Sequence, residues 1–329
     1  MKSTLVIGLG QQGRRYLRLC EAMGDIGLVA TVDPQAKDAT YSDVEEALVK
    51  FTPDTAVVAS PTKFHFEIAM KLIKAGIPTL IEKPLTHDAR QATELVEFAQ
   101  DSGVFVATGQ VERFNPAIRL VYDKLKSGEL GTPIALSFRR VGLPPLSSNE
   151  YGVVHDLAVH DIDIFSHLIG PPTLKGASGW PRTGSPESAF LLLSHNDVDA
   201  MIEVNWKTPV RIRQLSMTTD TCCVSIDYTA QKVEITQASD PENPLDFITF
   251  QARYTSAKRT LFEPVVVEPL KEQFRTFLDI ASTYETNSII ASGSKQATCL
   301  RETNSIIASG SDGCDAVRIA SEACKMIAD

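Results

Sequence analysis

The chain has 329 residues, more than twice the ~150 of a typical domain, which favours two domains with separate cores. Hydrophobic residues make up 43% and charged residues 22%, so the composition excludes intrinsic disorder and fibrous structure. The 32 Lys and Arg against 41 Asp and Glu give a net charge of −9, which argues against nucleic acid or an anionic membrane as a partner. An anionic ligand must therefore meet a local cluster of positive groups.

The cysteines indicate the compartment. There are six of them and no CxxC pair, at positions Cys20, Cys222, Cys223, Cys299, Cys314 and Cys324. The N-terminus lacks the basic, apolar and cleavage regions of a signal peptide, and no run approaches the ~18 to 20 apolar residues that cross a bilayer. The sequence therefore predicts a soluble, cytoplasmic protein with free thiols.

The first 120 residues alternate short apolar runs with longer amphipathic stretches. The runs lie at 5–7, 28–32, 56–59, 79–81 and 104–107. Continuous apolar runs separated by helices are typical of a parallel sheet that is buried on both faces. One intervening segment, 63–75, has apolar residues at helical spacing and ends at Gly76 followed by Pro78. We predict a doubly wound α/β domain over residues 1–120.

Residues 121–329 have a different pattern. After a helix predicted at 117–126, alternating runs occur at 134–139, 200–206, 211–217, 223–228 and 232–236. In the run 200–206, Ile202, Val204 and Trp206 alternate with more polar residues, which is the pattern of a strand with one covered face. We predict a second domain of α+β type with a large mixed or antiparallel sheet.

One segment near the C-terminus is duplicated. The decapeptide ETNSIIASGS occurs at 285–294 and again at 302–311. Two copies at a short offset are too few for a solenoid. We interpret 285–301 as a local tandem duplication, or as an artefact, that lengthens a surface loop before a last helix at 313–328. We expect no direct role in function.

The clearest motif is LVIGLGQQG, in which Gly8, Gly10 and Gly13 form GxGxxG between a strand and a helix. Such glycines permit a tight turn and close backbone approach, and the helix N-terminus receives a pyrophosphate. The alternative is a tight βα turn alone. Asp33 ends the second strand 20 residues later, where it would bind the ribose hydroxyls and repel a 2′-phosphate. We therefore predict NAD and disfavour NADP, because Lys37 is the only nearby cation.

The later strands of the first domain also end in polar clusters, which are 60–62 with His65, 82–84, and 109–115. Ligands of open α/β sheets bind beyond the carboxyl ends of the strands, so these clusters should line one crevice. The residues predicted to bind the cofactor are Gly8, Gly10, Gln11, Gln12, Gly13, Asp33, Ser60, Pro61, Thr62, His65, Glu82, Lys83 and Gln110. Lys83 is also a candidate electrostatic or acid/base group; the alternative is a solvated cation.

A second polar motif runs from His155 to Gly170 and is interpreted as one helix that ends at the glycine. Its polar side chains share one face, at Asp156, His160, Asp163 and His167, beside an apolar face of Leu157, Ile164, Phe165 and Leu168. His160 is a candidate general base, with Asp156 one turn away to orient it. The alternatives are a metal site, for which no HExxH-like pattern exists, and a helix with satisfied polar residues. We predict no metal.

Together, GLGQQG, Asp33, the EKP motif at 82–84 and the Asp156-xxx-His160 helix make the sequence similar to the Gfo/Idh/MocA family of NAD(P)-dependent oxidoreductases. The resemblance covers residues 1 to about 284. It implies a Rossmann domain and an α/β domain with an open sheet that commonly forms dimers or tetramers. It also implies that Lys83, Asp156 and His160 are the catalytic residues.

A narrower resemblance, carried by GQVERFNPAI, EVNWKTPVRIRQL and EPLKEQFRTFL, is to the nucleotide-sugar branch that oxidises the 3-hydroxyl of UDP-N-acetyl-hexosamines. Arg113, Lys207 and Arg211 could supply the positive charge that a diphosphate requires; the alternative is ordinary surface cations. The predicted substrate-binding residues are Lys83, Arg113, Phe114, Asn115, Asp156, His160, Lys207 and Arg211.

The predicted reaction is oxidation of a secondary sugar hydroxyl, with hydride passing to the nicotinamide. His160 takes the hydroxyl proton, Lys83 stabilises the alkoxide and Asp156 orients the pair, although Lys83 and His160 could exchange the role of base. Three alternatives stay open: an inositol or free aldose as the substrate, a non-catalytic NAD-binding regulatory protein, and a reductase acting on an imine or enol. The third needs reduced cofactor, usually NADPH, which Asp33 disfavours.

Overall fold

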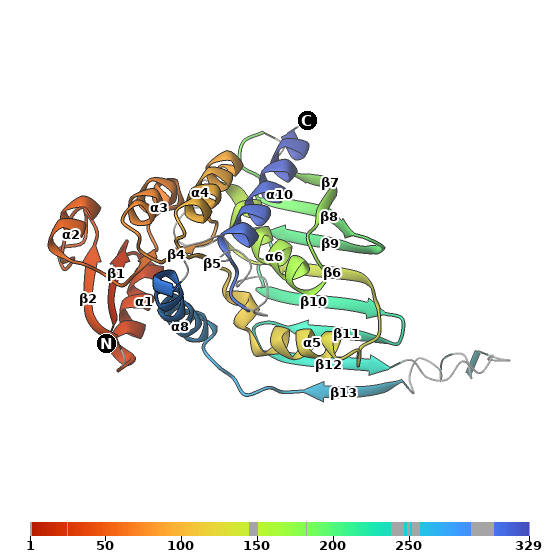
Figure 1. Ribbon diagram of the computed structural model, residues 1–329. Coiled ribbons are helices and arrows are strands. Elements are labelled where there is room, and N and C mark those ends of the chain that lie inside the picture. The colour runs from red at the N-terminus through yellow and green to blue at the C-terminus, as the bar shows by residue number, and fades with distance from the viewer. Residues whose placement is uncertain are drawn as a thin grey trace. The chain divides into compact units, whose positions relative to one another are not determined.

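The structure is a computed structural model that describes residues 2–24, 26–144, 151–181, 183–237, 247–248, 251, 257–290 and 306–328. It divides into two compact units. The first consists of Met1–Phe114 and Pro269–Ser321, and the second of Asn115–Glu268 and Glu322–Asp329. Each unit has its own sheet (Figure 1).

The first unit contains a five-stranded parallel sheet. Its strands are β1 (Lys2–Ile7), β2 (Ile26–Val32), β3 (Thr55–Val58), β4 (Thr79–Glu82) and β5 (Val106–Gly109), in the order β2-β1-β3-β4-β5. Each predicted run overlaps one of these strands, and the predicted parallel sheet is confirmed. Strands β3, β4 and β5 are buried throughout, as expected where helices cover both faces, whereas Leu28 in the edge strand β2 is 70% exposed.

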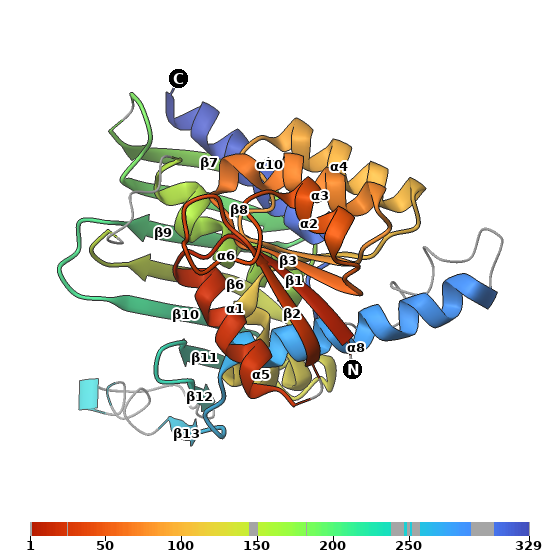
Figure 2. The same cartoon turned by 90° about the vertical axis from the view of Figure 1, so that its left-hand side faces the viewer.

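The helices of the first unit form a layer on each face of this sheet (Figure 2). One core cluster joins the sheet to α2 (Val44–Lys50), α3 (His65–Lys74), α4 (Ala89–Asp101) and the first part of α10 (Gly310–Ala328). The other joins it to α1 (Gln11–Ala22) and α8 (Pro269–Ile290). Two short 3-10 turns, η1 (Thr62–Phe64) and η2 (Val111–Phe114), follow β3 and β5.

The division predicted at residue 120 differs from these units in two stretches, because 115–120 belongs to the second unit and Pro269–Ser321 to the first. Helix α8 carries Phe274 and Phe277, both fully buried in the cluster that also contains Tyr16 and Phe105. The ring centroids of Tyr16 and Phe274 are 5.5 Å apart, and those of Phe105 and Phe277 are 5.9 Å apart. The chain therefore returns to its first core after building the second sheet.

The second copy of the duplicated decapeptide also belongs to the first core. Ile307 is 4% exposed and Ala308 is fully buried. The N–H of Thr108 donates to the Ala308 carbonyl at 2.9 Å, and Ser309 forms an antiparallel bridge with Ala107 of β5. Ala308 and Ser309 of this copy therefore extend the edge of the sheet, and 302–305 lies outside the described residues. Of the first copy, 285–290 ends α8, and 291–294 lies outside the described residues.

The second unit is built on an eight-stranded mixed sheet, which confirms the predicted fold class (Figure 1). Its order is β13-β12-β11-β10-β6-β9-β8-β7, and β6 and β9 form its parallel pair. The strands are β6 (Pro133–Val141), β7 (Thr173–Trp180), β8 (Ser188–His195), β9 (Val198–Asn205), β10 (Ile212–Thr219), β11 (Cys222–Asp227), β12 (Lys232–Gln237) and β13 (Lys258–Phe262). Alternation predicted five of them, and β7, β8 and β13 were not predicted.

Two faces of this sheet differ in exposure. Ile202, Leu215 and Val224 are buried, whereas Phe190 and Leu192 are exposed on the opposite face. The helices of this unit are α5 (Pro116–Lys126), a π-helical segment η3 (Val154–Ala158) and α6 (Val159–Leu168). Among the described residues, no helix has the length and apolar character needed to span a bilayer.

Candidate functional site

The glycine loop between β1 and α1 is closely packed on one side and open on the other. At Gly8, where φ is +90°, a Cβ would lie 2.6 Å from the Ser60 nitrogen. At Gly13 a Cβ would lie 1.7 Å from the Gly8 carbonyl oxygen, so only glycine allows helix and loop to approach this closely. A Cβ at Gly10 would meet no atom within 4 Å. The backbone at Gly10 therefore faces open space.

This open space fits a dinucleotide pyrophosphate. It lies where β1 has β2 on one side and β3 on the other, which is the switch point at which α/β sheets bind ligands. Helix α1 has no side-chain N-cap, so its first N–H groups are available to an anion. The Ser60 hydroxyl oxygen is buried and has no hydrogen-bond partner in the described part of the chain. A pyrophosphate could therefore approach the backbone at Gly10 and accept hydrogen bonds from the first N–H groups of α1 and from the Ser60 hydroxyl.

Asp33 ends β2 beside this loop and is ionised. Its Oδ2 accepts from the Leu9 N–H at 2.7 Å, and its Oδ1 accepts from Gln35 and Ala36 at 2.8 and 3.0 Å. Partial burial raises the pKa of Asp33, but these three N–H donors and the charge of Arg14 outweigh it, so the net pKa is lowered. A carboxylate in this place accepts ribose hydroxyls and repels a phosphate.

The prediction that Lys37 is the only cation near Asp33 is wrong, because Arg14 also acts on this carboxylate. Arg14 is close enough to stabilise the charge of Asp33, and its guanidinium donates two hydrogen bonds to Asp38, at 2.9 and 3.0 Å. The sequence gives no local signal for this pair because helix α1 and the loop after β2 meet only in the fold.

Glu82 is committed to contacts inside the first unit. It is 6% exposed, and its Oε1 accepts from the Tyr16 hydroxyl at 2.9 Å and from Gln12 Nε2 at 3.3 Å. Its Oε2 accepts from the backbone N–H of Lys83 at 3.2 Å. Burial raises the pKa of Glu82, although these donors and the Lys83 charge act in the opposite direction. The Glu82 side chain therefore supports the residues around it, and its predicted contact with the cofactor stays a prediction.

His65, also predicted to bind the cofactor, is buried between two backbone carbonyl groups. The ring is 1% exposed, with Nδ1 3.0 Å from the Pro84 carbonyl oxygen and Nε2 2.9 Å from that of Ser60. Burial lowers the pKa of His65, so the ring is neutral and donates through one nitrogen. His65 holds the loop after β3 against the loop after β4.

The other predicted cofactor residues lie at the same edge of the sheet. Lys83 is half-buried after β4, and its peptide bond to Pro84 is cis. Gln110 is buried directly after β5. The remaining three, at the starts of η1 and α1, are the exposed Pro61, the half-buried Thr62 and the exposed Gln11. The loops after β1, β3, β4 and β5 thus supply the candidate cofactor site.

In the second unit, the motif predicted as one helix is divided in two. Asp156 lies in the π-helical segment η3, and His160 lies in the first turn of α6. Both side chains are half-buried. Short π-helical segments are rare and frequently occur at functional sites. The periodicity of an ordinary helix could not reveal this segment.

The predicted polar face also included Asp163 and His167. Asp163 is only 2% exposed. The His167 ring stacks on Tyr122 of α5, with ring centroids 4.4 Å apart and planes at 10°. Asp156, His160 and His167 are thus half-buried, and Asp163 is the buried member of the four. Among the described residues, no group of three or more His, Cys, Asp or Glu is arranged to hold a metal ion.

A buried ion pair lies next to His160 in sequence. Asp161 is 1% exposed and accepts from Arg140 of β6, with contacts of 2.8 to 3.1 Å from Nη2 and Nε. The Arg140 guanidinium also lies 5.0 Å from the Tyr228 ring centroid. Since a buried charge requires a partner, this pair fixes α6 on the sheet that supports it. Sequence reasoning did not identify it.

Three consecutive residues predicted to bind substrate, Arg113, Phe114 and Asn115, are buried and contact other parts of the protein. Arg113 is 4% exposed and pairs with Asp312 at 3.2 Å, and this pairing lowers the Asp312 pKa against its burial. Phe114 is buried in a core cluster of the first unit. In the second unit, Asn115 caps α5 through the Ala117 N–H and donates to the Tyr228 carbonyl at 2.9 Å. Buried and engaged side chains of this kind cannot supply a free positive charge for a diphosphate.

The other two predicted cations are exposed in the second unit. Lys207 pairs with Glu187, and its ammonium lies 5.5 Å from the Trp180 ring centroid. Arg211 precedes β10 and makes no ion pair within the described residues. Of the three proposed cations, Arg211 is the one that is accessible without displacing a carboxylate.

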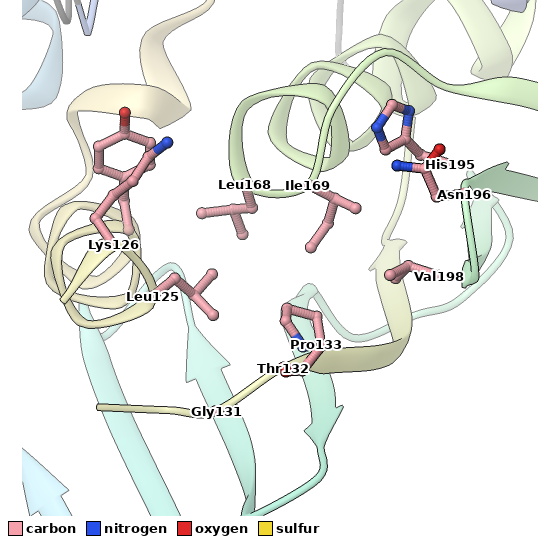
Figure 3. Close-up of a pocket in the computed structure, with 11 residues that line it drawn as sticks. Leu125, Lys126, Gly131, Thr132, Pro133, Leu168, Ile169, His195, Asn196 and Val198 are labelled. Atoms are coloured by element: carbon pink, nitrogen blue, oxygen red, sulfur yellow. The ribbon is translucent and has the colours of Figure 1, made fainter. Parts of the chain in front are cut away.

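The second unit also has a hollow of about 250 Å³ (Figure 3). Its lining is mostly apolar and comes from the ends of α5 and α6, the start of β6 and the β8–β9 turn. The labelled side chains include Leu125, Leu168, Ile169, His195 and Val198. It contains none of the predicted site residues, and the ring of His195 is held by the Pro171 carbonyl at 2.8 Å. The geometry assigns no chemistry to this hollow.

Comparison with known proteins agrees with this site. Residues 2–110 match the GFO_IDH_MocA family model, which is described as an oxidoreductase family with an NAD-binding Rossmann fold. The matched segment contains the glycine loop, Asp33 and Lys83. The first domain is thus an NAD-binding Rossmann domain, as predicted.

Among curated proteins, UDP-N-acetylglucosamine 3-dehydrogenase of Acidithiobacillus ferrooxidans is 30% identical over 175 residues, 51% of this chain and 54% of that enzyme. Inositol 2-dehydrogenase of Leifsonia xyli is 27% identical over 222 residues, 62% of this chain and 66% of that enzyme. These matches span between half and two thirds of the relatives' lengths.

Two solved structures share the fold over nearly the whole chain. The structure of the Acidithiobacillus enzyme has a TM-score of 0.77 at 21% identity and covers 99% of this chain and 98% of its own. The WlbA dehydrogenase from Bordetella pertussis, solved with NADH and UDP-GlcNAcA, has a TM-score of 0.77 at 17% identity, with 99% and 95% covered.

Replacing Gly10 by Ala should separate cofactor binding from folding. The residue has φ −69° and open space at the Cβ position, so the variant should melt within a few degrees of the wild type. A methyl group beside the pyrophosphate should weaken NAD binding roughly tenfold or more, measured by calorimetric titration. Gly24→Ala, which also has nothing within 4 Å, is the control and should bind NAD normally. Unchanged NAD affinity in Gly10→Ala would contradict the placement of the pyrophosphate at the glycine loop.

Proposed function

We propose that the chain is a Gfo/Idh/MocA oxidoreductase, whose family model matches residues 2–110, and that it is an NAD-dependent dehydrogenase of a secondary sugar hydroxyl. The observation that carries the proposal is the open glycine loop beside the ionised Asp33, at the same sheet edge as Lys83. An ionised carboxylate at this point favours NAD over NADP.

We propose the 3-hydroxyl of a UDP-N-acetyl-hexosamine as the position oxidised. The support is the 30% identity to the Acidithiobacillus UDP-N-acetylglucosamine 3-dehydrogenase. The inositol 2-dehydrogenases are nearly as similar, so inositol is the second candidate. Because Arg113 is buried and paired, the diphosphate would rely on the exposed Arg211 and on Lys207.

The proposed catalytic residues are Lys83, Asp156 and His160. When bound, NAD supplies the hydride acceptor. His160 accepts the hydroxyl proton at a ring nitrogen, and Asp156 orients that ring and stabilises its charge. Lys83 donates a hydrogen bond to the reacting oxygen and stabilises the charge that develops there. Their half-buried positions suit these roles because partial desolvation strengthens each interaction.

We propose a cytoplasmic location, supported by the free cysteines. The described cysteines, Cys20, Cys222, Cys223, Cys314 and Cys324, are all thiols. Disulfides form in oxidising compartments and are rare in the cytosol. Cell fractionation tests this location directly.

The exposed face of the second sheet supports a homodimer or homotetramer. Phe190 and Leu192 of β8 and Met201 of β9 are 42 to 52% exposed, and Leu192 pairs directly with Met201 in the sheet register. Trp180 of β7, 59% exposed, adds to this outer apolar face. Apolar patches of this kind on a folded chain mark association surfaces.

A charge in this apolar face should dissociate the oligomer. Leu192→Glu and Met201→Glu should each shift the molar mass towards that of one chain, measured by light scattering after size exclusion. Val49→Glu, at an 86% exposed position of α2 in the first unit, is the control and should leave the mass unchanged. A monomeric wild type, or unchanged assembly in both sheet variants, would contradict the proposal.

A thermal-shift screen tests the substrate class. UDP-sugars, inositols and free aldoses are each added with and without NAD, and hits are then assayed for NADH absorbance. A ligand at about 100 times its Kd stabilises the native state by roughly 2.7 kcal/mol, so a UDP-N-acetyl-hexosamine should raise the Tm by several degrees. A shift with inositols alone would select the second candidate. Binding without NADH formation across the panel would favour a regulatory protein.

Substitution of the proposed catalytic residues should slow turnover without removing the cofactor. Lys83→Ala and His160→Ala should each lower kcat roughly 100-fold or more, while the Kd for NAD stays within about twofold. Lys74→Ala, at the exposed end of α3, and His195→Ala are matched controls that should retain activity. Loss of NAD binding in both variants, with the fold intact, would argue against these roles.

A further inference from the structure

An exposed ion pair lies beside the residue that selects the cofactor. Arg14 is in the first turns of α1, and Asp38 is in the loop after β2. The guanidinium and the carboxylate face each other in a two-pronged contact, with Nη1 to Oδ2 at 2.9 Å and Nη2 to Oδ1 at 3.0 Å. The side chains are 50% and 59% exposed, so solvent and ligands can reach both.

This pair is near the ribose end of the cofactor site. The charge of Arg14 helps to keep Asp33 ionised, which places the guanidinium within electrostatic range of that carboxylate. Asp33 in turn accepts from the Leu9 N–H of the glycine loop at 2.7 Å. A 2′-phosphate on the ribose that Asp33 binds would therefore come within range of Arg14. Arginine is the side chain that Rossmann domains use to accept this phosphate.

We propose that Asp38 is a second determinant of cofactor choice, which excludes NADP by occupying the phosphate-binding fork of Arg14. The fork donates two parallel hydrogen bonds to Asp38, the same geometry by which it would hold a phosphate. While Asp38 is ionised it also repels any phosphate brought near Arg14. Both effects act against NADP, and neither acts on NAD, which lacks the phosphate.

The strength of this effect is limited by the exposure of the pair. Exposed ion pairs are individually weak and are screened by salt. Asp38 thus acts as a competitor for Arg14 and adds to the repulsion from Asp33. The proposal rests on NAD binding by the first domain and does not depend on the sugar substrate.

The test is direct binding of NAD and NADP to Asp38→Asn. The variant should bind NADP roughly three- to tenfold more tightly than the wild type at low ionic strength, with NAD affinity within about twofold. The gain should shrink as salt is added. Calorimetric titration measures these constants without turnover, so absent NAD binding in the wild type would instead overturn the assignment of the cofactor domain.

A double-mutant cycle identifies the cause. If Asp38 acts by occupying Arg14, the gain in NADP affinity should disappear in Arg14→Gln/Asp38→Asn relative to Arg14→Gln alone. Asp101→Asn is the charge-matched control, because α4 ends at Asp101 just before β5 begins, at the opposite edge of the sheet from the glycine loop. An unchanged NADP affinity in Asp38→Asn, an equal gain in Asp101→Asn, or a gain that persists without Arg14 would each overturn the proposal.

Discussion

A carboxylate buried at the end of β4 is the point on which the candidate cofactor site depends. Glu82 loses its hydration in the core and must be satisfied by the protein. Its donors are Tyr16 and Gln12 from α1 and the backbone of Lys83, and a Cβ at Gly109 would lie 3.1 Å from it. The need to satisfy one buried charge thus ties the helix of the glycine loop to the strand that carries Lys83.

The same logic explains which parts of the first unit could be predicted from sequence. The apolar runs of the parallel strands and the spacing of Gly8, Gly10 and Gly13 are local signals, and each needs only its immediate neighbours to be recognised. Asp33 was found in the same way, through its distance from the glycines. His65 and Glu82 were correctly placed near strand ends, but His65 also contacts Pro84 after β4, and Glu82 contacts Tyr16 of α1, and a single sequence does not reveal such partners.

The segment after β5 shows more clearly which contacts cannot be predicted from a single sequence. Arg113, Phe114 and Asn115 look like a binding cluster because polar and aromatic residues follow a strand end. In the structure Arg113 meets Asp312, which follows the second copy of a duplicated decapeptide. The first copy is followed by Lys295, so only the second copy is followed by the negative charge that pairs with Arg113. Partners so distant along the chain are chosen by packing, and neither periodicity nor motif spacing records them.

The surplus of acidic residues has a further consequence for anionic ligands. Several cationic side chains of this chain already form an ion pair with a carboxylate. The burial of each pair determines whether an anionic ligand can compete with the carboxylate for the cation. Arg113 is buried beside the half-buried Asp312, so separating the pair would leave the Arg113 charge without compensation. Lys207 with Glu187 is exposed and can exchange partners at little cost. If the substrate is the proposed UDP-sugar, exposed cations such as Lys207 and Arg211 would recognise its diphosphate, and buried pairs would contribute by holding the elements on which the site is built.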